Sequence, residues 1–498
     1  MKRLLLILIL LFNICLFSQS YVPDTSFGNN GSLFNNGVYF YPIDVMLINN
    51  YYYLISQKKI CKISYDGSID TTFGSNGFVT LDGNGLEYSI TGFKHTAGYF
   101  YIYGSVNDTD NNDDIFICKI DESGNFDAAF GTNNFAVINF DGRETINDFV
   151  MSADGDLFCI GSRDGYDTSG ENYSSVLIYF KIHADGTLNT NFDANGYKWV
   201  LLSNTSKGRF ITNYGDNFLL TGQDNQRNSG QTRNERLLIS QVDLNGSPVT
   251  AFGTNGSIVT NLDEGSICTV KDVQFINNNL YVNFFHEQSG TPTGSNILKF
   301  NIGTNQAVFN NAVSYTFDMQ VEANGIYITG INLCQQVTDI YCERDFNLLK
   351  KLLDGSNDTD SIPYTYSFPS IEMGYTDDQS VKVYKDDNGK VLLAGVSTLQ
   401  NGGSGFSLLR LQEEELGTAG LIKNNLNAYP NPFKDIITVD IAYGIIKNIE
   451  IMDLSGRTIH IPQGTGNNLN LSCLQQKGMY VVKVITTDNT YTKKIIKQ

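Results

Sequence analysis

Short apolar runs, most of them preceded by a turn rich in Gly, Asn and Asp, recur along most of the chain. The runs read NNYYYLIS, AGYFYIYGS, DGDLFCIGS, GDNFLLTGQ, NNNLYVNFF, NGIYITGIN and NGKVLLAGV. They are dense in aromatic and β-branched residues and show no helical periodicity, so they predict strands and hairpins. The pattern predicts an all-β protein with seven copies of one structural unit.

Two further phrases accompany the apolar run, and both predict tight turns. The first is K-x-x-x-D-G, as in KISYDGSID, and the second is D-x-x-F-G-x-x-G. The second phrase places phenylalanines 46 to 62 residues apart, at Phe27, Phe73, Phe130, Phe192 and Phe252. We expect these rings to be buried. We expect its aspartates to accept backbone hydrogen bonds, at Asp24, Asp70 and Asp127. We expect its glycines to adopt positive φ, at Gly28, Gly74, Gly131 and Gly253. Metal ligation by the aspartates is the alternative.

Units of about 60 residues with three or four strands are typical of propeller blades, which bury their faces against one another. We therefore predict a seven-bladed β-propeller over residues 21–411. The N-terminal phrase DTSFGNNG has no lysine-type strand before it, and the last such strand, residues 406–411, has no F-G phrase after it. We expect the N-terminal segment to complete the last blade and close the ring, which removes exposed sheet edges.

The two phrases resemble the delta-60 repeat, a β-propeller repeat of secreted bacterial proteins. The resemblance covers most of residues 21–411; it is strong in the first five copies and weak after about residue 300. It implies a propeller fold and no particular reaction.

The C-terminal segment has a different composition. After a linker at residues 412–425, the strands IITVDI, IEIMDL and YVVKVIT predict a small Ig-like β-sandwich over residues 426–498. The segment resembles the type A sorting domain of the type IX secretion system of Bacteroidetes. The residues that carry the match are Pro430, Asn431, Pro432, Gly456, Gly478, Lys493 and Lys494. The resemblance implies binding to the secretion machinery, then cleavage and either release or attachment at the outer-membrane surface. A fibronectin-like adhesive module is the alternative.

The N-terminus predicts a cleaved Sec signal peptide at residues 1–20. Lys2 and Arg3 precede an apolar stretch at 4–17, and Ser18 and Ser20 supply small residues for cleavage. A lipoprotein signal through Cys15 is a weaker alternative. No later run reaches the roughly 18 apolar residues of a membrane span, so we expect an exported, soluble monomer without a transmembrane segment.

The formal net charge is −18, which argues against a nucleic-acid partner. An acidic, solvated surface explains this charge, and cation-binding loops are the alternative. Among the eight cysteines, Cys61 and Cys118 precede a lysine in equivalent strands and read as buried hydrophobes. A disulfide between Cys334 and Cys342 is left open.

Sequence motifs for catalysis are absent. No nucleophile elbow, zinc-protease or phosphate-loop motif occurs. The histidines have no ligand-like spacing; they are His95, His183, His286 and His460. A polar cluster offers a weak Ca²⁺ site at Asp108, Asp110 and Asp114, but Asp113 and Lys119 stand where an EF-hand needs Gly and Glu. Short O-glycosylation patterns begin at Asp70 and Asp360.

The sequence favours a non-catalytic module that presents long polar loops to a glycan or protein ligand, with no cofactor. A secreted polysaccharide lyase or hydrolase with carboxylates at the centre of the ring is one alternative. A calcium-dependent adhesin is another. Convergent charged side chains with shifted pKa values at the centre would favour the enzyme.

Overall fold

The computed structural model divides the chain into two compact units, Met1–Glu413 and Glu414–Gln498. It describes residues 20–36, 40–81, 86–107, 113–166, 173–193, 196–226, 234–264, 267–288, 291–313, 316–330, 345–358, 363–366, 368, 377–398, 404–414, 426–441, 446–453, 457–460, 468–474, 476–486 and 490–498. The predicted signal peptide up to residue 19, Cys334 and Cys342 lie outside these ranges. Among the described residues, no helix has the length and hydrophobicity of a membrane span.

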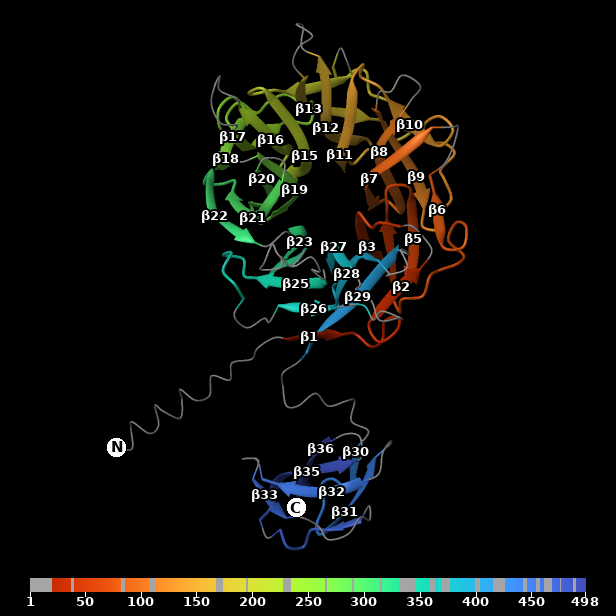
Figure 1. The fold of residues 1–498 in the computed structure, drawn as a ribbon, viewed down its shortest axis with the longest axis vertical. Coiled ribbons are helices and arrows are strands. Elements are labelled where there is room, and N and C mark those ends of the chain that lie inside the picture. Colours follow the sequence, from red (N-terminus) through yellow and green to blue (C-terminus); the bar gives the residue numbers. More distant parts are fainter. Residues whose placement is uncertain are drawn as a thin grey trace, which may run out of the picture. The chain divides into compact units, whose positions relative to one another are not determined.

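The described strands of the first unit form seven antiparallel sheets, which Figure 1 shows arranged in a ring. The first sheet contains β3 (Asp44–Ile48), β4 (Tyr51–Ile55), β5 (Lys59–Ser64) and β6 (Phe78–Thr80). The second contains β7 (Glu87–Thr96), β8 (Tyr99–Asn107), β9 (Asp113–Asp121) and β10 (Phe135–Ile138). The third contains β11 (Arg143–Met151), β12 (Leu157–Tyr166), β13 (Tyr173–Ile182) and β14 (Tyr197–Val200).

The remaining sheets repeat this order. The fourth contains β15 (Thr205–Tyr214), β16 (Asn217–Gln226), β17 (Asn234–Val242) and β18 (Ser257–Glu264). The fifth contains β19 (Ile267–Ile276), β20 (Asn279–Gln288), β21 (Thr291–Asn301) and β22 (Gln306–Val313). The sixth contains β23 (Thr316–Glu322), β24 (Gly325–Gly330), β25 (Phe346–Lys351) and β26 (Tyr364–Tyr366). The seventh contains β27 (Asp377–Lys385), β28 (Val391–Thr398), β29 (Ser404–Glu414), β1 (Ser20–Pro23) and β2 (Ser32–Asn36).

The seven apolar runs of the sequence form the second strand of each sheet. These strands are β4, β8, β12, β16, β20, β24 and β28. A second strand is paired on both edges and packed on both faces, which is why β24 is buried at every position and β28 at most of them. Continuous apolar runs follow from this double burial. The fold is all-β, as predicted, and sheets arranged radially in a ring form a β-propeller.

Each F-G phrase forms the turn that leads into the outermost strand of its own sheet, as residues 70–77 do between β5 and β6. In the second copy, Asp70 accepts a backbone hydrogen bond from Thr72 at 3.1 Å and pairs with Lys62 of the same sheet, also at 3.1 Å. The phenylalanine is buried in the first three copies and half-buried in the fourth and fifth. The glycines have φ between 53° and 65° at Gly28, Gly74, Gly131 and Gly253.

The K-x-x-x-D-G turn meets the F-G turn of the neighbouring sheet. Gly28 N donates to Asp66 O at 2.7 Å, and Gly131 N donates to Asp185 O at 2.7 Å. A Cβ atom on Gly186 would lie 2.8 Å from Gly131 N. Glycine is therefore required on both sides of this contact, where two backbones approach closely.

The chain ends of the repeat region meet in the seventh sheet. Asp24 N donates to Arg410 O at 2.8 Å, and Arg410 N donates to Gly31 O at 2.8 Å. Strand β2 pairs with β29 in antiparallel register. The equivalent two hydrogen bonds occur within the first sheet, where Asp70 N donates to Lys62 O and Lys62 N donates to Gly77 O. The prediction that the N-terminal segment completes the last blade is confirmed.

The core of the ring consists of apolar clusters between adjacent sheets. One such cluster joins the first and second sheets through Tyr53, Phe73, Phe93 and Phe100. Cys61 and Cys118 are free and fully buried, as their positions in apolar strands predicted.

The second unit consists of two small antiparallel sheets around its own core. One contains β30 (Leu426–Tyr429), β31 (Ile436–Ile441) and β34 (Asn468–Asn470); the other contains β32 (Ile446–Met452), β33 (Thr458–His460), β35 (Gly478–Thr486) and β36 (Thr490–Lys497). Apolar residues of both sheets form a single cluster. The unit is therefore a small β-sandwich.

The sorting-motif residues of this unit lie in and beside β36. Asn431, between Pro430 and Pro432, exchanges two hydrogen bonds with β36, from Ile496 N at 2.8 Å and to Lys494 O at 3.0 Å. Gly478 begins β35, and Lys493 and Lys494 pair with that strand. Gly456 lies outside the described residues.

Candidate functional site

The first strands of the sheets lie closest to the axis of the ring (Figure 1). We call them the inner strands; they are β3, β7, β11, β15, β19, β23 and β27. In six of them, the register with the second strand shifts by one residue, which is a β-bulge. The extra residues, which we call the bulge residues, are Thr91, Asn147, Arg209, Lys271, Phe317 and Val381.

A glycine of the second strand faces most of these bulges. It pairs with the residue before the bulge at Gly104, Gly161, Gly222, Gly330 and Gly395, while β20 has Phe284. A Cβ atom on Gly161 would lie 1.7 Å from Thr145 O. The glycine of IGS, TGQ or AGV in the sequence therefore marks the position of the bulge.

Two bulge residues bind the next sheet. Thr91 Oγ1 donates to Ile146 O at 3.0 Å, and Asn147 Nδ2 donates to Gly208 O at 2.8 Å. In both cases the acceptor is the residue before the bulge of the following inner strand. The bulges therefore direct polar side chains around the axis, from one sheet to the next.

The residue after the bulge is charged in several inner strands. These residues are Asp148, Asp272, Asp318 and Lys382, and Asp44 occupies the same place at the start of β3. Asp44 and Asp148 share one local geometry, because each accepts a hydrogen bond from the next backbone amide at 2.9 Å. Four aspartates and one lysine thus lie at one level of the inner strands.

Two of these carboxylates join neighbouring sheets. Asp148 accepts from Ile211 N of the fourth sheet at 3.0 Å and from Lys94 of the second sheet at 2.5 Å. Asp318 accepts from Val383 N of the seventh sheet at 3.0 Å and from Lys382 at 2.9 Å. A buried carboxylate with two charge-assisted or backbone donors is well satisfied, so both groups stabilise the contact between sheets.

Lys382 is the centre of a charged cluster. Its Nζ lies 2.9 Å from Asp318 and 3.9 Å from Asp44. Burial alone would lower the pKa of Lys382, but the carboxylates of Asp318, Asp44 and Asp272 raise it. Burial raises the pKa of Asp44 and of Asp272, and the charge of Asp318 raises both further. Lys382 therefore stays protonated and positively charged, while Asp272 keeps its proton to a higher pH than an exposed aspartate does.

Chemically, the cluster combines a carboxyl group of raised pKa with carboxylates and an ammonium group. Such a set is able to donate a proton, to accept one, or to bind a polar ligand. None of these residues belongs to a motif that the sequence shows. The available signal was a charged residue within an apolar inner strand that precedes a glycine-containing second strand.

The predicted Ca²⁺ ligand that the structure describes is Asp114, which is buried in β9. Its Oδ2 accepts a hydrogen bond from Asn139 at 3.3 Å, and its charge acts on Glu144 of the third sheet. Asp108 and Asp110 lie outside the described residues. Within the described part of the chain, no group of three or more potential ligands could hold a metal ion.

Glu144 is fully buried, and its titration gives a pH prediction. Burial, and to a lesser extent Asp114, raises the pKa of Glu144 to about 7. A folded-state pKa above the unfolded value favours the folded state below about pH 4.5, and this contribution is lost as the pH rises through 7. We expect Glu144→Gln to remove this loss, by about 3 kcal/mol at pH 8. Urea unfolding of the unchanged chain and of the variant at pH 5 and pH 8 measures the free energy of unfolding. If the two proteins differ by the same amount at both pH values, the prediction is contradicted.

The histidines are dispersed among the sheets. His95 lies 3.0 Å from Glu122, and His183 lies 3.4 Å from Asp156. His286 lies 3.7 Å from the sulfur of Cys268, and His460 belongs to the second unit. The partners named for His95, His183 and His286 each belong to the same sheet as the histidine.

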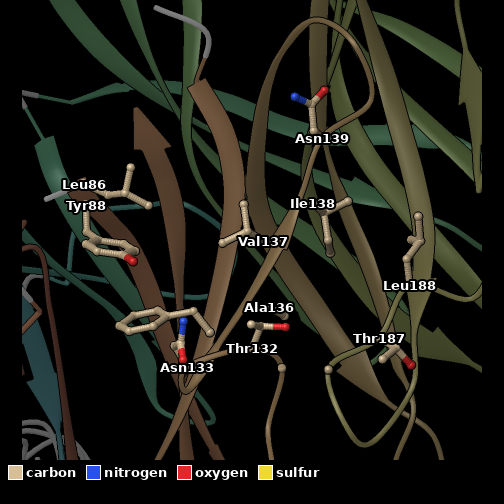
Figure 2. Close-up of a pocket in the computed structure, with 13 residues that line it drawn as sticks. Leu86, Tyr88, Thr132, Asn133, Ala136, Val137, Ile138, Asn139, Thr187 and Leu188 are labelled. Atoms are coloured by element: carbon tan, nitrogen blue, oxygen red, sulfur yellow. The ribbon is translucent and has the colours of Figure 1, made fainter. Parts of the chain in front are cut away.

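A pocket of about 670 Å³ lies along β10, the outer strand of the second sheet (Figure 2). Tyr88, Phe135 and Val137 line it together with Asn133 and Asn139. Tyr88 and Phe135 are buried and stacked with their ring centroids 4.6 Å apart, whereas Val137 is 47% exposed. None of the charged inner-strand residues lines this pocket.

Solved structures with a similar fold have little sequence identity to the chain. The polysaccharide lyase Uly1 is 10% identical, with a TM-score of 0.43 over 76% of this chain and 91% of that chain. The WD40 domain of Neurospora crassa Pan2 is 8% identical, with a TM-score of 0.39 over 74% and 89%. The β-propeller domain of the Trilobed protease from Pyrococcus furiosus is 8% identical, with a TM-score of 0.30 over 71% and 95%. Such likenesses say nothing about activity.

The sequence of the second unit matches a known family. A search of curated proteins found no match. Residues 427–498 match the family model described as the secretion system C-terminal sorting domain. The match covers both small sheets and all the sorting-motif residues named above. The chain is therefore a secreted protein that joins a β-propeller to a secretion-system sorting domain.

Proposed function

We propose that this protein is a non-catalytic binding module of the delta-60 propeller type, exported by a type IX secretion system of Bacteroidetes. The second unit acts as the sorting signal, and each of the seven sheets of the first unit is one blade. The sheets present a ligand-binding face to an extracellular glycan or protein. The N-terminal residues serve as the Sec signal peptide.

The observation that carries the binding role is the equivalent position, in six sheets, of the strand ends that polar connections join. Each joins the second and third strands of a sheet, so all leave equivalent ends of their sheets. We call this end of the ring the loop face. Its connections, which lie outside the described residues, are 108–112, 167–172, 227–233, 331–344 and 399–403, and the two-residue connection 289–290. Variable polar segments held on a rigid scaffold are typical of recognition surfaces.

The non-catalytic role is supported by the partners of the inner-strand carboxylates. Asp148 and Asp318 are both saturated by a lysine and by a backbone amide of the next sheet. Groups that hold neighbouring blades together are poor candidates for proton transfer, because each change of protonation would weaken the ring. The burial of Asp148 and Asp318 between neighbouring sheets follows from this structural role.

A binding screen with the full chain tests the proposal. We expect retention on an array of polysaccharides and secreted proteins, with no change in the size of the retained ligand. Exchange of residues 227–233 for a short Gly-Ser turn should weaken binding, whereas replacement of Asn277 and Asn278, in the β19–β20 turn at the other end of the ring, by Gly-Gly should not. Absence of any retained ligand contradicts the proposal, and so does equal binding by the loop variant.

A polysaccharide-active enzyme is the second candidate, and the Lys382 cluster favours it. Asp272 and Asp44 carry raised pKa values beside a cation, as acid–base catalysts often do. Incubation with acidic and neutral polysaccharides, followed by measurement of new reducing ends, distinguishes the enzyme from the non-catalytic binding module. Product formation that is abolished by Asp272→Asn and kept by Asp148→Asn would establish the enzyme.

A calcium-dependent adhesin rests on the acidic pair of Asp114 and Glu144. Under our proposal the thermal midpoint of the full chain is the same in millimolar calcium and in EDTA. A rise of several degrees in calcium that is lost in Glu144→Gln would favour the adhesin instead.

A further inference from the structure

Arg209, the bulge residue of β15, differs from Arg163 of β12 and Arg410 of β29. Its Nε atom is buried and has no hydrogen-bond partner among the described residues. Burial lowers its pKa. By contrast, Arg163 donates to Phe140 O at 2.8 Å, and Arg410 donates to Asp24 at 2.9 Å. A desolvated guanidinium group with no anionic partner among the described residues is unfavourable, which makes Arg209 a candidate for binding an anion.

The repeated geometry of the bulges places Arg209 beside a second cation. Each preceding bulge residue reaches the carbonyl just before the next bulge, as Asn147 reaches Gly208 O. In the next pair of sheets, Arg209 and Lys271 hold the bulge positions that Thr91 and Asn147 hold in the second and third sheets. Lys271 is exposed and is the bulge residue of the following inner strand. Two basic residues therefore hold equivalent bulge positions on neighbouring inner strands.

Aromatic rings lie beside this pair of cations. Lys271 Nζ lies 4.8 Å from the ring centroid of Phe285, on the second strand of the same sheet. Phe285 in turn packs edge-on against Phe317, with centroids 6.1 Å apart. Both rings are half-buried, so each keeps an accessible apolar surface. The bulge residues of three consecutive sheets thus supply two cations and an aromatic ring.

Arg209 and Lys271 lie near the middle of β15 and of β19. In β15, Thr205 pairs with Asn225, at the end of β16 that leads into residues 227–233. Arg209 follows Thr205 by four positions, which is about 13 Å along a strand. A ligand that approaches the loop face therefore reaches Arg209 and Lys271 before it reaches the opposite end of the ring.

We propose that Arg209 and Lys271 bind a carboxylate or sulfate group of an acidic polysaccharide, with Phe285 and Phe317 against the apolar face of its sugar ring. The inference rests on the proposed function and specifies its ligand class. A guanidinium group binds either anion through two parallel hydrogen bonds, and an ammonium group adds a point charge. Aromatic surface with a few placed polar groups is typical of small-ligand sites.

The surrounding charge favours a short anionic segment over a long polyanion. The chain carries a net charge of −18, so a polymer that needs a wide basic surface, such as nucleic acid, is repelled. Burial raises the pKa of Asp272, the residue after Lys271, which reduces the negative charge beside the site near neutral pH. One anionic sugar unit at a time fits two cations.

Binding of polygalacturonate and dextran sulfate to the full chain tests the inference, with neutral dextran and poly-glutamate as controls. We expect the chain to bind at least one acidic polysaccharide in calorimetry and to bind neutral dextran at least about tenfold more weakly. Polygalacturonate and dextran sulfate separate carboxylate from sulfate recognition. Binding to poly-glutamate alone, or equal binding to neutral dextran, overturns the inference.

Variants locate the site. Arg209→Met and Lys271→Met should each weaken binding by about tenfold or more, whereas Arg143→Gln, which removes an exposed charge at the start of β11, should leave it within twofold. Arg209→Met should also raise the thermal midpoint by about 2 °C, because it removes a desolvated charge. Unchanged affinity in both methionine variants, or a lower midpoint for Arg209→Met, overturns the inference.

Failure of the inference and failure of the proposed function give different results. If the full chain binds a neutral glycan or a protein and the methionine variants bind it equally well, the binding role stands and this site does not. If the full chain retains no ligand of any class, the proposed function itself fails.

Discussion

Arg410→Met is expected to destabilise the propeller more than any other single replacement of a charged residue in it. Arg410 is 1% exposed and lies in β29, where the C-terminal end of the ring meets the N-terminal segment. Its guanidinium group donates to Asp24 at 2.9 Å, to Ser26 at 3.0 Å and to the carbonyl of Tyr65. The same group lies 4.7 Å from the ring centroid of Phe27.

The expected loss is about 3 kcal/mol in the free energy of unfolding of the first unit. Removal of one partner from a buried ion pair typically costs about 3–5 kcal/mol, because the other charge stays buried. Lys390 lies 3.1 Å from Asp24 and keeps it partly neutralised, so we expect the lower end of this range. Urea unfolding measures the loss, and limited proteolysis should cut the N-terminal segment earlier in the variant.

Lys62→Met is the matched control, because Lys62 occupies the position of Arg410 in the first sheet. Lys62 pairs with Asp70 at 3.1 Å, but both partners keep more than a tenth of their side-chain surface exposed and belong to one continuous segment. We expect a loss of about 1 kcal/mol or less. Equal losses in the two variants would show that the closing sheet has no special dependence on its arginine.

Gly161→Ala is expected to disrupt the third sheet, with a loss of about 3 kcal/mol or more. The added Cβ would lie 1.7 Å from Thr145 O, which belongs to the backbone of the inner strand. Relief of this overlap requires the bulge between Ile146 and Asp148 to move, and Asp148 ties the third sheet to the fourth. Overpacking against a backbone that holds two sheets together exceeds the usual effect of an added methyl group.

Gly303→Ala serves as the control for this variant. A Cβ there would have Asn301 Oδ1 at 3.4 Å as its nearest neighbour, in ordinary contact. We expect a change within about 0.5 kcal/mol. In the fifth sheet, Phe284 occupies the place of this glycine. A loss below about 1 kcal/mol for Gly161→Ala would show that β11 is able to adopt the geometry of β19.

The sequence determined the all-β class and the place at which the ring closes. Apolar runs flanked by Gly, Asn and Asp specify paired strands through local turn geometry and through burial on both faces. The incomplete units at the two ends of the repeat predicted that Asp24 would complete the unit of Arg410. The repeat alone predicted this contact, because the same backbone hydrogen bond occurs within the first sheet, from Asp70 N to Lys62 O.

The sorting domain was also readable from the sequence, because its signal consists of short motifs in a fixed order near the C-terminus. Asn431 is explained locally, since it bonds to β36 on both sides of Ile495. The match of residues 427–498 to the sorting-domain model agrees with that interpretation.

Only the tertiary structure brought the inner-strand residues together. Asp44, Asp272 and Lys382 are separated by more than 100 residues from one another, and no motif joins them. Their proximity depends on the closed arrangement of the sheets and on bulges that direct side chains around the axis, from one sheet to the next. The sequence also could not show that Arg209 Nε lacks a partner among the described residues, because the partners of a charged group depend on the sheets on either side. Repetition and turn chemistry are local and can be read along the chain, whereas the environment of a charged group is a property of the assembled ring.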